Sequence, residues 1–355
     1  MQNTTSKYPR VTVLIPVYNG EKYLHGAISS ILTQSFSDFE ILVVDDRSTD
    51  KTIEIMKCYS DNPKVHLMQN ETNLGPGATR NRGFLAARGE YIAMLDCDDL
   101  ACPDRLAEQV SFLDSHPDFG MVGSAVEMID SELCVFGLAF FRQAPEEIPP
   151  TLLFNNCFAN SAIMAKRIVL LEERYKEDVF FSEDYELWVR IVRKYKAWNL
   201  PKILLRYRLH PSSTGQANQG KMRGMIRSIL LSQLLELKVD FNEQEADLHF
   251  SIGMYEYGRD REYINRVERW FKKLAEANRR ANVYREPALL NVLRKHWVRL
   301  CISRIALGPW IVYKALRADF GGGWVSILMF AGFVRDYFLM SLGRRRLLRR
   351  LFGMR

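Results

Sequence analysis

Three aspartates, Asp96, Asp98 and Asp99, follow one another at the end of the apolar run 91–95. A short buried strand that ends in three carboxylates is costly unless a cation binds there. Alternate side chains of a strand share a face, so Asp96 and Asp98 can point the same way. Carboxylate oxygens suit Mg²⁺ or Mn²⁺, which keep coordination positions open for substrate phosphates. The alternative is a solvated loop whose aspartates cap the helix predicted from residue 103.

A second acidic pair, Glu183 and Asp184, stands at the start of a helical pattern that runs to residue 192. Ser182 before the pair completes a capping signature. A carboxylate at this position, oriented by backbone amides, is suited to take a proton from an attacking hydroxyl. The alternative is that these three residues only cap the helix. The apolar stretch 179–181 before the pair predicts that it is drawn into the region of the sheet.

The elements that must position these acids alternate between strand and helix. Apolar, β-rich runs predict strands, and apolar residues at helical spacing predict the helices between them. This alternation predicts an α/β fold with a mainly parallel sheet, in which ligands bind beyond the carboxyl ends of the strands. Three polar clusters fall at such ends: 16–19, 45–46 and 96–98. The predicted strands are 11–16, 39–44, 65–68 and 89–95, and the predicted helices are 21–33, 53–56, 78–87 and 104–113.

The rest of the chain changes character near residue 220. Before it, strands are predicted at 120–124, 125–129, 161–165 and 203–209, with a helix starting near residue 151. After it, only long helical segments follow, at 222–237, 243–257, 262–280 and 287–306. Residues 1–220 carry 23 Lys+Arg against 29 Asp+Glu, whereas residues 221–355 carry 26 against 13. We therefore predict two parts, 1–220 and a mostly helical basic region 221–355.

The basic region suggests a surface partner. Tryptophans stand beside cations at 270–274, 297–300 and 310–314, and an arginine cluster follows at 344–350. Basic amphipathic helices with aromatic residues suit an anionic membrane surface. Nucleic-acid binding is disfavoured because no recognition motif accompanies the charge, and a solvated helical face is the alternative for 221–300. We predict peripheral attachment through 305–355. The apolar run 320–334 is shorter than the ~20 residues of a spanning helix.

The cysteines and the N-terminus bear on the compartment. The six cysteines lack the spacing of a zinc site, so reduced thiols in a cytosolic protein are expected. The polar residues 1–7 lead directly into a strand and do not read as a secretory signal. A cytoplasmic protein, peripheral on the cytoplasmic face of the inner membrane, is the expectation.

Six short motifs together resemble the family 2 glycosyltransferases, which have the GT-A fold. The resemblance covers roughly residues 10–215 and leaves the C-terminal third outside. Each motif alone is weak evidence, but their order and spacing are specific. They are 12–19 (TVLIPVYN), 43–50 (VVDDRSTD), 73–75 with 80–83 (NLG, RNRG), 95–99 (LDCDD), 183–184 (ED) and 207–210 (YRLH).

The resemblance implies an inverting transfer of a sugar from a nucleoside diphosphate sugar, most often of uridine, to an acceptor hydroxyl, helped by Mn²⁺ or Mg²⁺. It implies a GT-A (Rossmann-like) sheet flanked by helices. The acceptor would be a saccharide or lipid-linked saccharide in surface polysaccharide or lipopolysaccharide synthesis, transferred as a hexosyl or N-acetylhexosaminyl group. A metal held by carboxylates neutralises the charge that grows on the departing diphosphate.

The resemblance also implies residue roles. Asp98 would ligate the metal and Asp96 would face both ribose and metal. Asp184, rather than Glu183, matches the general base of the family. The nucleotide would be bound by Asp46 at the base, by a pocket shaped by Pro16, Tyr18 and Asn19, and by the charge of Arg80.

His210 is a further candidate, because a histidine in this context approaches the metal or the diphosphate in relatives and imidazole can do either. A histidine followed by proline is otherwise a structural turn residue. Asp46 could cap a helix, Tyr18 could be ordinary packing, and Arg80 could be a surface ion pair.

Two other functions compete with the transferase. A sugar-phosphate nucleotidyltransferase would carry a glycine-rich phosphate loop after the first strand, where this chain has Pro16 to Asn19. A membrane-associated nucleotide-sugar binding protein would need no base, whereas this chain retains both Asp98 and Asp184.

Overall fold

The computed structural model describes residues 8–141, 143–210 and 218–317. The chain forms two compact units. The first comprises the described residues of 1–145 and 158–225, and the second those of 146–157 and 226–317. The sequence predicted a division near residue 220 and placed 146–157 in the first part. This segment instead belongs to the second unit, because Leu153 and Phe154 are fully buried in that unit's core.

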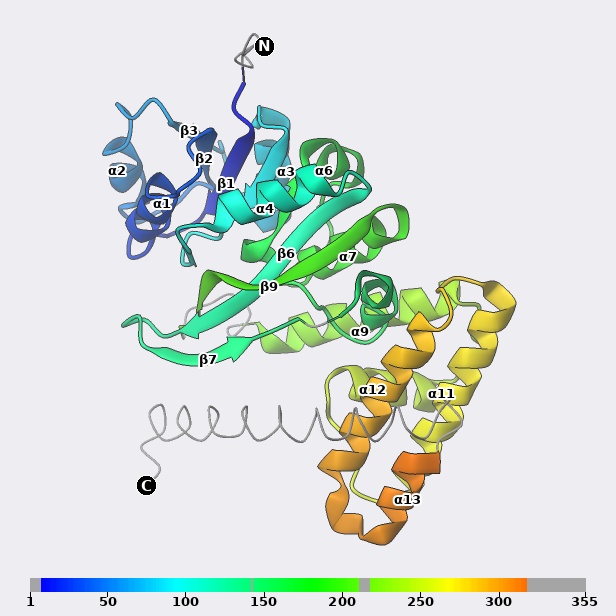
Figure 1. The fold of residues 1–355 in the computed structure, drawn as a ribbon. Helices are drawn as coiled ribbons and strands as arrows, with labels where there is room; N and C mark the ends of the chain where they lie inside the picture. The colour runs from blue at the N-terminus through cyan, green and yellow to red at the C-terminus, as the bar shows by residue number, and fades with distance from the viewer. Residues whose placement is uncertain (1–7, 142, 211–217, 318–355) are drawn as a thin grey trace. The chain divides into compact units, whose positions relative to one another are not determined.

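The first unit is built on a sheet that contains nine strands among the described residues (Figure 1). The order is β3-β2-β1-β4-β8-β6-β9-β5, and β7 pairs with β6. The four N-terminal strands are parallel, and β8 joins them to β6 by antiparallel pairing on both sides. These strands are β1 (Val11–Val17), β2 (Phe39–Asp45), β3 (Val65–Gln69), β4 (Tyr91–Met94), β5 (Leu100–Ala101), β6 (Phe119–Ile129), β7 (Val135–Ala139), β8 (Met164–Lys166) and β9 (Lys196–Arg208).

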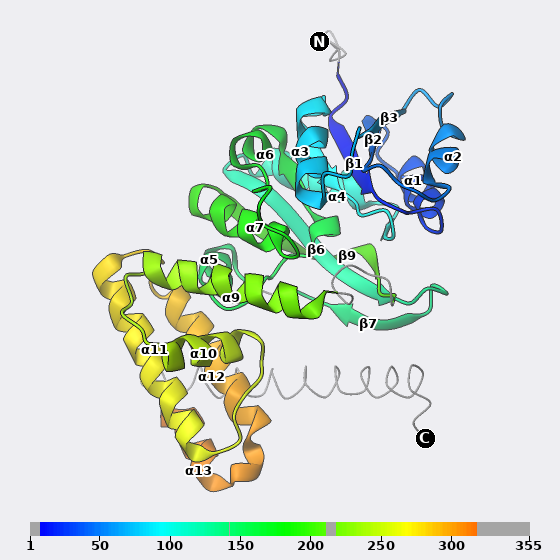
Figure 2. The same cartoon turned by 180° about the vertical axis from the view of Figure 1, so that it is seen from behind.

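Helices cover both faces of this sheet. Figure 1 shows α1 (Leu24–Leu32) and α4 (Arg105–Ser115) on the near face, and Figure 2 shows α3 (Pro76–Ala86), α6 (Arg167–Glu173) and α7 (Glu183–Lys194) on the other. The short α2 (Thr52–Lys57) packs beside α1. Side chains alternate along β1, so Val13 and Ile15 join the cluster that includes α1 and α4, whereas Leu14 approaches Gly83 of α3.

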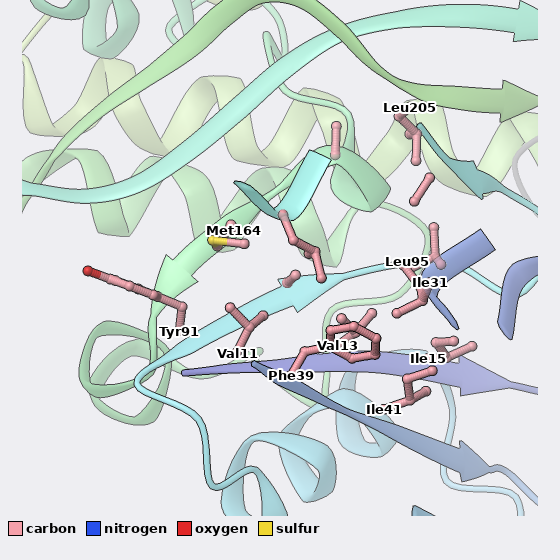
Figure 3. Packing of buried hydrophobic residues seen from close by; sticks show 14 of the residues in the cluster. Val11, Val13, Ile15, Ile31, Phe39, Ile41, Tyr91, Leu95, Met164 and Leu205 are labelled. Atoms are coloured by element: carbon pink, nitrogen blue, oxygen red, sulfur yellow. The ribbon is translucent and has the colours of Figure 1, made fainter. Parts of the chain in front are cut away.

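The core of the first unit lies between the sheet and the helices α1 and α4. Figure 3 shows the apolar side chains of the parallel strands packed together there, with Val13, Ile15 and Ile41 at 0% exposure. Near-continuous apolar runs are typical of parallel strands, which are buried on both faces. This burial brings the carboxyl ends of β1, β2 and β4 to one edge, which confirms the predicted α/β fold with the polar clusters at strand ends.

The strands after residue 115 differ from the sequence prediction. The expected strand 203–209 is the end of β9, which begins at Lys196 and pairs in parallel with β6. The expected strand 161–165 is a 3-10 helix (Asn160–Ala162) followed by β8. A helix was expected to start near residue 151, but α5 (Ile148–Thr151) ends there. Helix α6 and strands β5 and β7 were not predicted.

The second unit is helical. It contains α5, most of α9 (Gln219–Glu236), α10 (Glu243–Gly253), α11 (Arg261–Ala281), α12 (Ala288–Ser303) and α13 (Pro309–Arg317). The ends of these helices are specified locally. Asn242 and Glu245 form a capping box at α10, Asp260 accepts from the N–H of Tyr263 at α11, and Asn282 ends α11 in the left-handed conformation.

The tryptophans of the second unit are core residues. Trp270 and Trp297 are 2% and 1% exposed, and Trp310 packs against the same cluster. The reading of 270–274 and 297–300 as aromatic contacts for a membrane surface is therefore wrong. Trp270 donates its indole N–H to Nδ1 of His249 at 3.1 Å, and burial lowers the pKa of His249 to about 4. His249 is thus neutral at pH 7 and bonds to the Leu153 carbonyl at 2.9 Å through Nε2.

The predicted membrane-attaching segment 305–355 is described only to residue 317, so the apolar run 320–334 and the arginine cluster lie outside the described residues. Within the ranges described, no helix is both long enough and apolar enough to cross a bilayer.

Candidate active site

Two loops at the carboxyl edge of the sheet are joined through Asn19. Its backbone N–H donates to Oγ of Ser48 at 2.8 Å, and its side-chain oxygen accepts from the N–H of Thr49 at 2.8 Å. Asn19 adopts a positive φ of 53°, which asparagine tolerates better than most residues. Pro16 lies within β1, and Tyr18 is 51% exposed. The structure therefore brings Pro16, Tyr18 and Asn19 to the predicted edge, with the Tyr18 ring open to a ligand.

Asp46 organises a third loop at this edge. The buried carboxylate accepts hydrogen bonds from Asn70 Nδ2 at 2.7 Å and from the backbone N–H groups of Leu74 and Gly75 at 2.8 and 2.9 Å. Three of its roughly four acceptor sites are thus used within the protein. Asp46 fixes the loop 73–75 and retains limited capacity for the N–H of a nucleobase, so its predicted nucleobase contact stays a prediction.

Arg80 links the two acidic clusters. Its Nη2 donates to Asp96 Oδ1 and its Nη1 to Glu183 Oε1, each at 2.8 Å. The residue is 8% exposed, and although burial opposes the charge, the two carboxylates hold the pKa of Arg80 well above its usual range. Its terminal nitrogens are directed to these carboxylates, so Arg80 acts in this structure as a positioning residue for both clusters. The alternative of a surface ion pair is wrong.

Asp96 is held in place from several sides. Its backbone N–H donates to Oγ of Ser161 at 2.7 Å, and its carboxylate approaches Nδ2 of Asn160 at 3.3 Å. Tyr175 donates its hydroxyl to Oδ1 of Asn160 at 3.0 Å. Asn160 and Ser161 were missed by the sequence reading, because a residue that supports a loop from a distant 3-10 helix leaves no local pattern.

Asp98 meets His210 across the site. Oδ2 of Asp98 lies 3.0 Å from Nε2 of His210, although 112 positions separate them. Arg208, at the end of β9, donates Nε to the Asp98 carbonyl and its backbone N–H to Asp99 Oδ1, both at 2.7 Å. The ring of His210 packs on Tyr23 with centroids 5.0 Å apart. The end of β9 thus brings His210 to the aspartate loop. Its contacts with Asp98 and Tyr23 show that His210 is more than a structural turn residue.

The donor set around Asp98 fits a divalent cation of the Mn²⁺ type. A carboxylate and an imidazole are ligands that Mn²⁺ accepts, and Asp98 and His210 are both in reach of one ion. Asp96 contributes less, since Oδ1 is bonded to Arg80. Across the described part of the chain, no three His, Cys, Asp or Glu side chains converge as a complete metal site. The protein thus offers a partial set that a substrate diphosphate would complete.

Asp184 is the second acid of the cluster at the start of α7. Burial raises the pKa of Asp184 to about 6, and the charges of Glu183 and, less strongly, Asp96 add to the effect. Its Oδ1 accepts from the N–H of Tyr185 at 2.7 Å. The predicted cap is wrong in one respect, because Ser182 makes no side-chain capping bond and donates instead to the Phe181 carbonyl.

Tyr207 is a member of the site that received no role from the sequence. Burial raises the pKa of Tyr207, and the charges of Asp99, Asp96, Asp98 and Asp184 raise it further. Because Arg80 bonds Asp96 and Glu183, each at 2.8 Å, both acidic clusters belong to one site. The motif 207–210 contains Tyr207, but only His210 in this motif was assigned a role from the sequence.

The comparisons with known proteins agree with this geometry. The model of the family described as "Glycosyl transferase family 2" matches residues 12–133. An uncharacterised glycosyltransferase of Methanocaldococcus jannaschii is 36% identical over 210 residues, covering 57% of this chain and 71% of the relative. The putative teichuronic acid biosynthesis glycosyltransferase TuaG of Bacillus subtilis is 28% identical over 212 residues, covering 58% and 81%.

Two solved structures share the fold. TarS residues 1–349 of S. aureus, in complex with UDP-GlcNAc, superposes with a TM-score of 0.54 at 20% identity, over 81% of this chain and 90% of that one. The mannosyltransferase PcManGT of Pyrobaculum calidifontis, in complex with GDP-Man and Mn²⁺, gives 0.50 at 17%, over 92% and 88%. These likenesses confirm the predicted GT-A type of α/β fold with a helical C-terminal region.

Proposed function

The chain belongs to glycosyltransferase family 2, and from this membership we propose that it transfers a sugar with inversion from a nucleoside diphosphate sugar to a hydroxyl of a saccharide or lipid-linked saccharide. A UDP-sugar is the favoured donor and surface polysaccharide synthesis the favoured context. TarS was solved with UDP-GlcNAc, and TuaG is named for a polysaccharide pathway, which supports both choices. The curated relatives are named as glycosyltransferases, whereas donor, metal and stereochemistry belong to the proposal.

The observation that carries the proposal is the Arg80 bridge from Asp96 to Glu183, which joins the aspartate loop to the helix start where burial raises the pKa of Asp184 to about 6. A general base works best when its pKa is close to the working pH. At pH 7 Asp184 is ionised but more basic than an ordinary aspartate. It would accept the proton of the acceptor hydroxyl as that oxygen attacks the anomeric carbon.

The chain's own residues would divide the remaining work. The loops held by Asn19 and Asp46 would bind the nucleoside, with Tyr18 at the opening. Asp98 and His210 would hold the divalent ion, which supplies positive charge for the departing diphosphate. Arg80 would hold Asp96 and Glu183 in place through its two ion pairs, and Asp184, which follows Glu183, would accept the proton.

The two competing functions have less support. The loop after β1 is 18–23 and lacks the glycine-rich phosphate sequence of a nucleotidyltransferase. A nucleotide-sugar binding protein gains nothing from a carboxylate with a raised pKa beside the donor, since burying that charge destabilises the fold.

The proposal is tested by nucleoside diphosphate release from a panel of UDP-, GDP- and dTDP-sugars, with Mn²⁺, Mg²⁺ or EDTA. We expect one donor to be consumed in a metal-dependent way, with inversion at the anomeric carbon seen by NMR. Asp98→Ala is expected to lower activity by about 10²-fold or more and to weaken Mn²⁺ binding measured calorimetrically. Asp130→Ala, an acid of the β6–β7 turn, is the control. Full activity in EDTA would exclude the metal, and a donor that binds without turnover would favour the binding protein.

Peripheral attachment to the cytoplasmic face of the inner membrane remains part of the proposal and is supported by the sequence alone. The basic excess of 221–355 motivates it. Deletion of 305–355 is expected to move the protein from the membrane fraction to the supernatant at physiological salt. Equal partitioning of the full chain and the truncated chain would refute the attachment.

A further inference from the structure

Phe180 is a large apolar side chain that the fold leaves exposed in the loop before the proposed base. Phe180 is 46% exposed and precedes Asp184 by four positions. The sequence predicted that the stretch 179–181 would draw the acidic pair into the sheet region. The stretch instead lies in the loop between α6 and α7, and the expectation is wrong for Phe180. Single exposed apolar residues are common, so it is the position of Phe180, four residues before the proposed base, that makes it a candidate for a ligand contact.

The ring is held in position from one side. A Cβ atom built on Gly75 would lie 3.3 Å from Cε1 of Phe180, so the ring edge rests on this glycine. Gly75 has a φ of +86°, and its N–H is bonded to Asp46. The next residue, Phe181, has a φ of +67°, and Nζ of Lys221 lies 5.7 Å from its ring centroid. Phe180 is thus located between the loop held by Asp46 and the start of α7.

The chemistry of the reaction indicates what the open part of the ring contacts. The acceptor hydroxyl must come within hydrogen-bond reach of Asp184, so the acceptor sugar lies beside the start of α7. The face of an aromatic ring is electron-rich, and the C–H groups on one face of a pyranose are the complementary apolar surface. The donor nucleoside is assigned to the loops of Asn19 and Asp46. Of the two substrates, the acceptor is therefore the one to which no apolar side chain has yet been assigned.

We propose that Phe180 forms an acceptor subsite, on which the C–H face of a pyranose ring packs so that its hydroxyl is presented to Asp184. This inference rests on the proposed function. It specifies the acceptor as a saccharide whose terminal ring has one apolar face, and it makes Phe180 a residue for acceptor binding and not for donor binding.

The test compares Phe180→Ala, Phe180→Leu and Phe180→Trp in full-length protein, with the Michaelis constants of donor and acceptor measured separately. The acceptors are the methyl β-glycosides of glucose, galactose and N-acetylglucosamine. Phe180→Ala is expected to raise the acceptor KM about tenfold and to leave the donor KM and the slow hydrolysis of donor by water unchanged. Phe180→Trp is expected to stay within threefold of wild type, and Phe180→Leu to fall between.

Ile168→Ala is the matched control, because Ile168 is 58% exposed and follows Arg167, whose N–H bonds to the Glu90 carbonyl at the opposite end of β4 from Asp96. An unchanged acceptor KM in Phe180→Ala would overturn the subsite. A raised donor KM with an unchanged acceptor KM would also overturn it and assign the ring to the nucleotide.

A separate measurement distinguishes this inference from the proposed function. If the wild type consumes no donor, the function fails, and saturation-transfer NMR of the same glycosides in the presence of UDP still decides the subsite. Transfer to the pyranose C–H protons that disappears in Phe180→Ala would support the subsite. Equal transfer in both proteins, or none in the wild type, would overturn it.

Discussion

Asp184→Asn is expected to lower kcat by about 10²- to 10⁴-fold, the range that removal of a general base typically costs. In the wild type, kcat/KM is expected to fall about tenfold per pH unit below pH 6, because the pKa of Asp184 is raised to about 6 and the protonated carboxyl cannot accept a proton. This acidic limb is expected to be absent from the residual activity of the variant. The measurement is a pH–rate profile at saturating donor and metal.

The same variant is expected to be more stable than the wild type. A carboxyl whose pKa rises from 3.8 unfolded to about 6 folded binds its proton more tightly in the folded state. The fold therefore loses stability as the pH rises from 3.8 through 6, by at most about 3 kcal/mol at pH 7. Asparagine has nearly the same shape and no charge, so it removes this cost.

Glu183→Gln is the matched control and is expected to shift stability in the opposite direction. It removes the charge that Arg80 Nη1 contacts at 2.8 Å and leaves the buried guanidinium with one carboxylate. Activity in Asp184→Asn within tenfold of wild type would show that another group is the base, whatever the stability change.

Arg80→Met is expected to destabilise the first unit by about 3–5 kcal/mol, because it leaves Asp96 and Glu183 partly buried without their shared cation. Activity is expected to fall as well, since Asp96 and the start of α7 lose their common anchor. Urea denaturation at pH 7 measures the first effect, and donor turnover under conditions where the variant is folded measures the second.

Arg10→Met is the comparison, because its pairs with Glu90 and Asp114 are exposed and such pairs contribute about 0–1 kcal/mol. Addition of Glu183→Gln to Arg80→Met is expected to recover part of the stability, since one uncompensated carboxylate disappears. A free energy of unfolding for Arg80→Met within 1 kcal/mol of wild type would mean that water solvates both acids. The positioning role would then be wrong.

The parallel half of the fold could be predicted from local patterns because each of its strands is a short apolar run bounded by a turn. Strands β1, β2 and β3 end within one residue of the predicted ends. The half after residue 115 was less predictable. β9 begins with Lys196 and contains Pro201, and its pairing with β6, in which Phe119 lies opposite Lys196 and Ile129 opposite Arg208, outweighs its mixed composition.

The site divides in the same way. Asp96, Asp98 and Asp184 were found because carboxylates at a strand end or a helix start are conspicuous in sequence. The partners that position them were not, since Asn160, Ser161 and Arg208 reach the acids from elements far along the chain. Arg80 was found for its charge, but its partners Asp96 and Glu183 are 16 and 103 positions away and became visible only in the folded chain.

The sequence by itself determined the chemistry available to this protein: acids at the ends of buried strands, an acidic pair at a helix start and a basic C-terminal region. Residue type and local spacing decide these features, and both are readable along one dimension. Only the tertiary structure decided the surroundings of each acid, because Arg80 bonds Glu183 and burial raises the pKa of Asp184. It also decided that Trp270 is core and Phe180 is exposed, since burial depends on what distant segments bring to the same place.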